Sequence, residues 1–272
     1  MGFLAYKIMS CVILLPIHKI ELSINEIKSV QHNVKILKDW DHIIISPNEI
    51  IEDVKDIFTN SACKNIKYIG LSKKHFKSVT SYDQMLIKSW FYKLFMEYKY
   101  LLITQPDVII FRDELRKWMG KEYDYIGAPW VINSKNSKES YYVGNGGISL
   151  RKIDSYIDSL KSLKLVKCPE WYLEIKKVPR IFMGIAKYCF GFNKLILFPK
   201  THEDFFWSQL IPSTNIEFKV APVEDSFKFA IETFKQDSHE NISIDSMPFA
   251  IHGWEKHASK ELILKIESLI DG

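Results

Sequence analysis

Residues 100–107 read Tyr-Leu-Leu-Ile-Thr-Gln-Pro-Asp, an apolar run that ends in a carboxylate. A short apolar run followed by a proline turn is typical of a buried strand in a parallel sheet. In open α/β sheets, ligands bind at the edge where such strands end. Asp107 is therefore a candidate ligand for a divalent cation, which diphosphate oxygens and water would complete. A carboxylate that only caps a turn gives the same pattern.

The hundred residues before this run alternate short apolar stretches with segments of helical periodicity. Ser23 and Glu26 have the spacing of a capping box, which marks a helix start. The alternation predicts an α/β fold with a central mixed, mostly parallel sheet and helices on its faces. The expected strands are 8–15, 42–45, 66–69 and 100–104, and the expected helices are 23–37, 47–58 and 81–98.

Length and composition fit a globular enzyme. The 272 residues are 47% hydrophobic, which is enough for one α/β domain that spans 1–272. A net charge of +4 is too small to indicate nucleic-acid binding. The four cysteines form no Cys-x-x-Cys pair, so we expect free thiols in a reducing cytoplasm. No stretch is long enough to cross a bilayer, and the N-terminus lacks a signal-peptide pattern.

A basic, aromatic insertion is expected at about 161–200. This stretch holds nine Lys or Arg against two acidic residues, a net charge of +7. Basic residues with apolar ones between them suit peripheral binding to the anionic inner face of the cytoplasmic membrane. A solvated helical excursion packed on the core is the alternative interpretation.

A glycine-rich segment, 144–147, reads Gly-Asn-Gly-Gly. Glycines allow backbone to approach a ligand closely, and Asn145 with the amides of Gly146 and Gly147 could bind sugar hydroxyls. The segment lacks the Lys-Ser/Thr ending of a phosphate loop. A glycine turn in a hairpin is the structural alternative.

Two further segments carry ionisable groups. Glu203 and Asp204 stand at an expected helix start, where a carboxylate could act as a general base or could only cap the helix. His252 precedes Lys256 by four residues. The imidazole could bind a metal and the ammonium a phosphate, although a lone histidine is often structural.

Together these motifs resemble a bacterial family of unknown function that is grouped with GT-A glycosyltransferases and is often encoded among surface-polysaccharide genes. The resemblance rests on segments 81–82, 90–92, 102–107, 123–130, 144–152, 203–206 and 252–256, in that order along the chain. It implies a single GT-A-like, Rossmann-like domain that binds a nucleotide-sugar donor, with a UDP-sugar favoured.

The resemblance also implies roles for individual residues. Asp107 matches the last acid of the Asp-x-Asp signature, and His252 matches a C-terminal metal ligand, so the two would hold Mn²⁺ or Mg²⁺. Gln105 replaces the first acid of the signature, and a neutral amide is a poorer partner for such ions. Asp204, or else Glu203, would be the catalytic base. The implied nucleotide-sugar contacts are Pro16, His18, Lys19, Tyr82, Lys88, Gln105, Asp107 and Lys256, and the implied acceptor or sugar pocket is Trp130, Asn145, Gly146 and Gly147.

The sequence therefore predicts a cytoplasmic glycosyltransferase that moves a sugar to a glycan or lipid-linked glycan in surface-polysaccharide synthesis, with inversion. One alternative is a retaining transferase on the same fold. Another, favoured by Gln105, is a non-catalytic member that binds a nucleotide or a partner protein within a polysaccharide-assembly complex.

Overall fold

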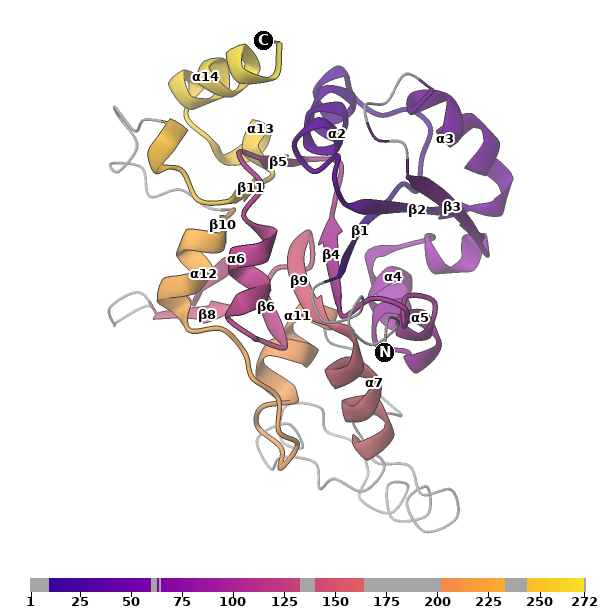
Figure 1. The fold of residues 1–272 in the computed structure, drawn as a ribbon, viewed down its shortest axis with the longest axis vertical. Helices are drawn as coiled ribbons and strands as arrows, with labels where there is room; N and C mark the ends of the chain where they lie inside the picture. The colour runs from indigo at the N-terminus through magenta and orange to yellow at the C-terminus, as the bar shows by residue number, and fades with distance from the viewer. Residues whose placement is uncertain are drawn as a thin grey trace.

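A computed structural model of the chain describes residues 10–59, 63, 65–132, 140–163, 202–232 and 244–271 (Figure 1). Most of the insertion expected at 161–200 lies outside these ranges, as do Cys168 and Cys189. The side chains of Cys11 and Cys63 are buried. Within the described ranges, no helix is long and apolar enough to cross a membrane.

The first part of the chain alternates strands and helices, as predicted. Its elements are β1 (Cys11–Pro16), α2 (Ile24–Ile36), β2 (Asp41–Pro47), the 3-10 turn η1 (Asn48–Ile50), α3 (Ile51–Ile57) and β3 (Ile66–Leu71). Both hydrogen bonds of the Ser23–Glu26 capping box are present at the start of α2. The three strands pair in parallel, with Ile13 opposite His42 and Ile43 opposite Lys67.

The prediction of a single helix at 81–98 is wrong. After the 3-10 turn η2 (Lys73–His75), the chain forms two short helices, α4 (Val79–Leu86) and α5 (Ser89–Lys93), and Lys88 between them is extended. The carbonyl oxygen of Leu86 accepts hydrogen bonds from the Tyr92 hydroxyl at 2.7 Å and from the Trp207 indole at 3.2 Å. Because tertiary donors satisfy this carbonyl, the helix can end there without leaving it unpaired.

The central sheet has six strands in the order β3-β2-β1-β4-β9-β6. β4 (Tyr100–Thr104) matches its prediction and lies parallel to β1. β9 (Ile148–Lys152) runs antiparallel to both β4 and β6 (Tyr125–Gly127). The predicted α/β fold with a mixed, mostly parallel sheet is therefore confirmed. Two helices flank these strands in the chain: α6 (Leu115–Gly120) precedes β6 and α7 (Ile153–Ser162) follows β9.

Two small sheets lie beside the main one. The first contains β10 (Ala230–Ile231), β11 (Ala250–His252) and β5 (Val108–Ile110), and the second pairs β7 (Pro129–Ile132) with β8 (Ser140–Val143). The remaining elements of the described ranges are α11 (Glu203–Phe205), the π-helical turn η4 (Phe206–Leu210), α12 (Val223–Phe229), the 3-10 turn η5 (Ile244–Ser246), α13 (Trp254–His257) and α14 (Lys260–Asp271). α14 lies against α2 (Figure 1). Between them, Lys28 Nζ lies 2.7 Å from Asp271 Oδ1.

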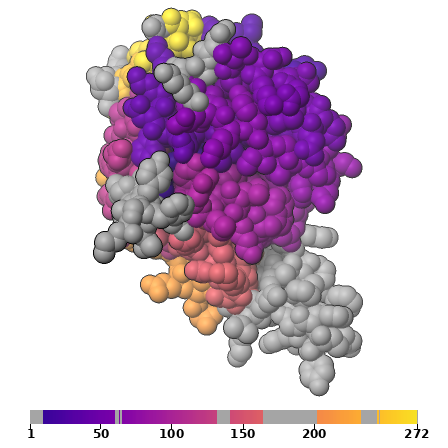
Figure 2. Space-filling view, turned by 45° about the vertical axis from the view of Figure 1, so that its right-hand side comes forward, coloured from indigo at the N-terminus to yellow at the C-terminus, as the bar shows by residue number. Residues whose placement is uncertain are grey.

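The alternation of side chains along the strands divides the core. Val12 and Leu14 of β1 pack with α4, α5 and α7, while Cys11 and Ile13 face β5, α6 and the end of α2. In the face shown by Figure 2, atoms of the N-terminal half cover the upper part, and α7 lies beneath them. Because both faces of the sheet are buried, the ends of its strands are the places where polar side chains can gather.

Candidate functional site

Asp107 lies at the junction of the main sheet and a small one. It follows β4 through Gln105 and Pro106 and directly precedes β5. β11 runs antiparallel to β5, with His252 opposite Val108. The backbone N–H of Gly253 donates to the Asp107 carbonyl at 2.9 Å. Residues from two sheets are thus brought together where β4 ends.

Four side chains meet at this point, and we call them the Asp107 cluster: Gln105, Asp107, His252 and Lys256. The His252 Nε2 atom lies 3.3 Å from Asp107 Oδ1 and 3.2 Å from Gln105 Oε1. Lys256 Nζ lies 3.2 Å from Asp107 Oδ2. The structure therefore brings His252 and Lys256, which the sequence predicted as one segment, into contact with the carboxylate of Asp107.

Opposite charges tune the Asp107 cluster. Burial disfavours the charged carboxylate of Asp107, but hydrogen bonds from His252 and Lys256 outweigh it and hold the pKa of Asp107 well below its usual range. Burial likewise disfavours the imidazolium of His252, but hydrogen bonds to Asp107 and Glu232 raise its pKa to about 9. The cluster thus places cationic groups beside an ionised carboxylate.

Once Nε2 of His252 has lost its proton, the donor atoms of the Asp107 cluster have the spacing to hold a divalent cation that shares its ligands with a substrate. Cis ligands on a six-coordinate ion of Mg²⁺ size lie about 3 Å apart, close to the spacings of His252 from Asp107 and Gln105. In the described part of the chain, no group of three or more His, Cys, Asp or Glu residues gathers to hold a metal. A diphosphate and water would have to supply the remaining ligands.

Asn145 connects the Asp107 cluster to the acidic pair at α11. Its φ of 82° is left-handed, a conformation that asparagine tolerates better than most residues. Its side-chain oxygen accepts from the backbone N–H of Gly147 at 2.9 Å, and its Nδ2 atom lies 3.1 Å from His252 Nδ1. Its backbone N–H donates to Asp204 Oδ2 at 3.2 Å.

At Gly146 and Gly147, neighbouring side chains approach the backbone so closely that only glycine fits. A Cβ atom on Gly146 would collide with the Glu203 carboxylate, and one on Gly147 would collide with the His252 ring. In this structure, Gly146 and Gly147 therefore allow Glu203 and His252 to lie directly against the backbone.

Glu203 is enclosed by a buried ion pair. Arg151 donates from Nη2 and Nη1 to its two carboxylate oxygens at 2.7 and 2.9 Å, and both side chains are buried. Arg151 also donates to Ser149 Oγ and to the Tyr92 hydroxyl. Burial raises the pKa of the Glu203 carboxyl and Arg151 opposes this shift. Both oxygens of Glu203 are thus held by the Arg151 guanidinium.

Asp204 faces Asn145 from the start of α11. Its Oδ1 atom accepts from the Phe205 backbone N–H at 2.6 Å, and its Oδ2 atom accepts from Asn145. Asp83 of α4 lies nearby and pairs with His202, the residue that precedes α11, at 3.1 Å. Burial raises the pKa of Asp83, and the charge of Asp204 adds to this shift.

Three aromatic rings form a row that ends at the residue after Asp204, and we call them the aromatic shelf: Trp130, Tyr142 and Phe205. Trp130 and Tyr142 oppose each other across β7 and β8, with ring centroids 6.2 Å apart, and Tyr142 meets Phe205 at 6.1 Å. Trp130 remains 36% exposed. An exposed indole is a surface on which a sugar ring can stack.

The other predicted nucleotide contacts are spread along the strand ends. Pro16 ends β1 at the same edge of the sheet as Gln105, and His18 beyond it is exposed. Lys19 pairs with Glu26 of α2 at 3.2 Å. Lys88 caps α5. None of these has a contact with the Asp107 cluster that the described residues reveal.

Tyr82 lies near the Arg151–Glu203 pair. Burial raises the pKa of its hydroxyl, and the charges of Arg151 and Glu203 also act on it. This hydroxyl is buried and has no hydrogen-bond partner within the described ranges. Tyr82 is thus placed with the Arg151–Glu203 pair.

Two residues of the site were not predicted from sequence. Arg151 lies within segment 144–152 but has no predicted role, because nothing in the local sequence indicates its partner Glu203, 52 residues away. Glu232 Oε1 lies 3.1 Å from His252 Nδ1. It follows β10, a two-residue strand with too little periodicity to be predicted.

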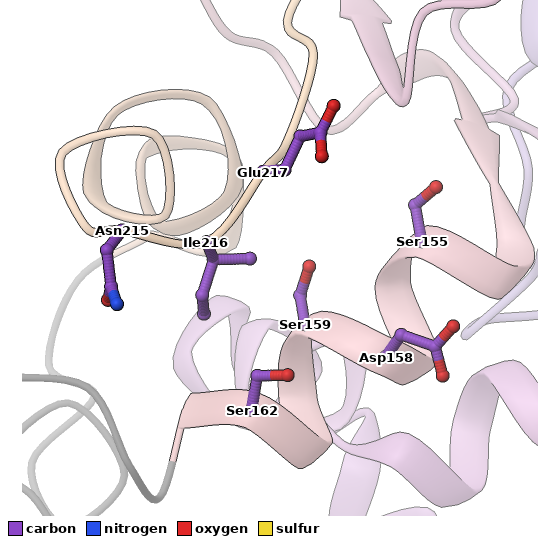
Figure 3. A pocket seen from close by; sticks show the side chains of 7 residues that line it. All are labelled: Ser155, Asp158, Ser159, Ser162, Asn215, Ile216 and Glu217. Carbon is purple, nitrogen blue, oxygen red and sulfur yellow. The ribbon is translucent and has the colours of Figure 1, made fainter.

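The structure also has a polar hollow of about 470 Å³ elsewhere (Figure 3). It lies between α7 and the turn after η4, and its lining includes none of the predicted site residues. The residues that line it are Ser155, Asp158, Ser159, Ser162, Asn215, Ile216 and Glu217. It is therefore separate from the Asp107 cluster.

Comparison with known proteins places the fold. A family model described as "Protein of unknown function (DUF5672)" matches residues 65–252, whereas no curated protein matches the sequence. An active-site mutant of LgtC aligns at 11% identity over 95% of this chain and 95% of that chain, with a TM-score of 0.51. Mouse xyloside xylosyltransferase 1, in its apo form, aligns at 10% identity over 90% of this chain and 97% of that chain, also with a TM-score of 0.51. The chain thus has the GT-A fold seen in these glycosyltransferases.

Proposed function

The chain belongs to the family described as "Protein of unknown function (DUF5672)". Because it has the GT-A fold, we propose that it is a nucleotide-sugar-dependent glycosyltransferase. The observation that carries the proposal is the continuous contact from Asp107 through His252 and Asn145 to Asp204. It joins an anion-and-cation cluster suited to a diphosphate with a carboxylate suited to a general base.

In the proposed reaction, the donor is a nucleoside-diphosphate sugar, with UDP-sugars favoured. Its diphosphate lies against the Asp107 cluster. A bound Mn²⁺ or Mg²⁺, held by Asp107 and His252, would supply Lewis-acid stabilisation of the leaving diphosphate. Lys256, 3.2 Å from Asp107, adds a positive charge on the same side. These groups favour departure of the diphosphate because its negative charge grows in the transition state.

Asp204 takes the proton of the acceptor hydroxyl, and the oxygen then attacks the anomeric carbon from the face opposite the diphosphate. The carbon–oxygen bond to the diphosphate breaks as the new glycosidic bond forms, so the configuration inverts. The hydrogen bond from Asn145 fixes Asp204 relative to the donor cluster. Glu203 is the less suitable base, because its carboxylate is held in a buried ion pair with Arg151, whereas Asp204 accepts, among the described residues, only from backbone N–H groups.

The aromatic shelf supports a saccharide acceptor. A pyranose ring stacked on the exposed face of Trp130 would lie beside Tyr142 and Phe205, and Phe205 directly follows Asp204. We therefore propose a glycan or lipid-linked glycan acceptor, as in the building of surface polysaccharides, with the enzyme acting in the cytoplasm.

The proposal is tested by product release. The full chain is incubated with a panel of nucleoside-diphosphate sugars and Mn²⁺, and free nucleoside diphosphate is measured with and without saccharide acceptors. We expect turnover with at least one donor, and a loss of 10²- to 10⁴-fold in kcat for Asp204→Asn. The control is Asp158→Asn, an exposed carboxylate on α7. Full turnover by a folded Asp204→Asn variant would contradict the proposed base.

A further inference from the structure

The register of the small sheet places His252 between two carboxylates. β10 and β11 pair in parallel, with Ala230 opposite Ala250 and Ile231 opposite Ile251. The next residues along the two strands are Glu232 and His252. On the other side, β5 pairs with β11 and begins directly after Asp107. Three strands therefore align Glu232, His252 and Asp107 in one row.

Each nitrogen of the His252 ring faces its own carboxylate. Nδ1 lies 3.1 Å from Glu232 Oε1, and Nε2 lies 3.3 Å from Asp107 Oδ1. The side chains of His252, Asp107 and Glu232 are only 14%, 19% and 22% exposed. In this partly dry setting the ring has little freedom to exchange these partners for water.

Asn145 would give the ring a different proton arrangement if Glu232 were absent. The side-chain oxygen of Asn145 already accepts from Gly147 and Ile148, so its Nδ2 atom is the donor that faces His252 Nδ1. Without the Glu232 carboxylate, a neutral ring would accept from Asn145 at Nδ1. The ring proton would then lie on Nε2 and point at Asp107 and Gln105.

We infer that Glu232 is a positioning residue, which holds a proton on Nδ1 of His252, so that Nε2 is the nitrogen that can exchange its contact with Asp107 for a divalent cation carried with the diphosphate. A carboxylate that accepts from the outer nitrogen of a ligating histidine fixes both its tautomer and its orientation. The inference rests on the proposed donor site, and it adds a residue to which no role has been assigned.

The position of the ring proton is read directly by ¹⁵N NMR of the full chain with UDP and a Mg²⁺ concentration that saturates the wild type, at a pH at which the His252 ring is neutral. We expect the proton on Nδ1 in the wild type and on Nε2 in Glu232→Ala. Glu232→Asp retains a carboxylate and should restore Nδ1–H at least in part. The control is Glu224→Ala, which removes an exposed carboxylate from the first turn of α12. A proton on Nε2 in the wild type, or no change in Glu232→Ala, overturns the inference.

Metal affinity provides the second readout. Free Mn²⁺ is measured by electron paramagnetic resonance while the protein is titrated in the presence of UDP. We expect Glu232→Ala to bind Mn²⁺ 10- to 100-fold more weakly than the wild type, while Glu224→Ala binds it equally well. Equal affinity of a folded Glu232→Ala variant and the wild type overturns the role of Glu232 toward the cation.

Failure of the proposed function gives a different result. If the wild type binds no Mn²⁺ with any nucleoside diphosphate, the proposed metal site is wrong and the inference fails with it, whereas wild-type binding that Glu232→Ala retains in full overturns only the role of Glu232. Thermal unfolding of each variant shows that the compared proteins are folded.

Discussion

The backbone N–H of Asn145 donates a hydrogen bond to Asp204 across 59 residues of sequence, at 3.2 Å. The side chain of the same Asn145 reaches His252, which contacts Asp107. One residue in a left-handed conformation therefore sets the spacing between the proposed base and the proposed diphosphate site. The two adjacent acids at α11 consequently have different environments, and this difference leads to the first prediction.

Glu203→Gln should mainly lower the free energy of unfolding and have less effect on the rate of sugar transfer. The change leaves the fully buried guanidinium of Arg151 without its counter-charge, and breaking such a pair costs about 3–5 kcal/mol of the free energy of unfolding. Urea unfolding measures this loss, with Asp204→Asn as the matched control. A stable Glu203→Gln variant that has lost its turnover would instead identify Glu203 as the base.

Gly147→Ala should impair the donor site through His252. The new methyl group collides with the imidazole, which is held between Asp107 and Glu232 and has little room to move. We expect a loss of about 1–3 kcal/mol of stability from overpacking and at least about tenfold weaker nucleotide binding. Gly120→Ala is the control, because no atom lies within 4 Å of its added Cβ. Equal nucleotide binding by both variants would refute the close packing of His252.

The stability of the metal-free protein should depend on His252 between about pH 6.5 and 9. Its pKa is raised from 6.5 to about 9 in the folded state, so the stabilisation is complete below 6.5 and is lost as the pH rises through 9. The difference corresponds to about 3 kcal/mol. Urea unfolding at several pH values in EDTA tests this, because His252→Gln should lack the pH-dependent term. A wild type and variant with parallel pH profiles would exclude a charged His252.

Trp130→Ala should weaken acceptor binding without affecting the donor. Loss of one aromatic stacking surface costs about 1–2 kcal/mol, which is roughly a 5- to 30-fold rise in KM for a saccharide acceptor. Hydrolysis of the donor in the absence of acceptor should be unchanged. Trp90→Ala is the control, since that indole is 39% exposed and stacks on His75 of η2. An unchanged acceptor KM would remove the aromatic shelf from the acceptor site.

Strand β4 could be predicted because it is buried on both faces. The run that begins at Tyr100 is apolar at nearly every position and ends at a proline turn, so its bounds were found to the residue. The capping box at Ser23 located the start of α2 in the same way. Local residue patterns determine such features, and they required no knowledge of distant contacts.

The remaining features depend on distant contacts. The break between α4 and α5 depends on Tyr92 and Trp207, which donate to Leu86 from later turns and elements. The partner of Glu203 is 52 residues away, and Glu232 is aligned with His252 only by strand pairing. Sequence patterns identified Asp107, Asp204 and His252 as candidates, while their mutual geometry came only with the fold.

Binding of a nucleoside diphosphate to the Asp107 cluster is the central claim, and calorimetric titration of UDP into the full chain with Mn²⁺ tests it most directly. Other nucleoside diphosphates are titrated in parallel. We expect saturable binding by the wild type and at least about tenfold weaker binding by Asp107→Asn, which keeps the shape of the side chain but removes its charge. Absence of binding by the wild type to every nucleoside diphosphate, or equal affinity of the wild type and a folded Asp107→Asn variant, would contradict the account.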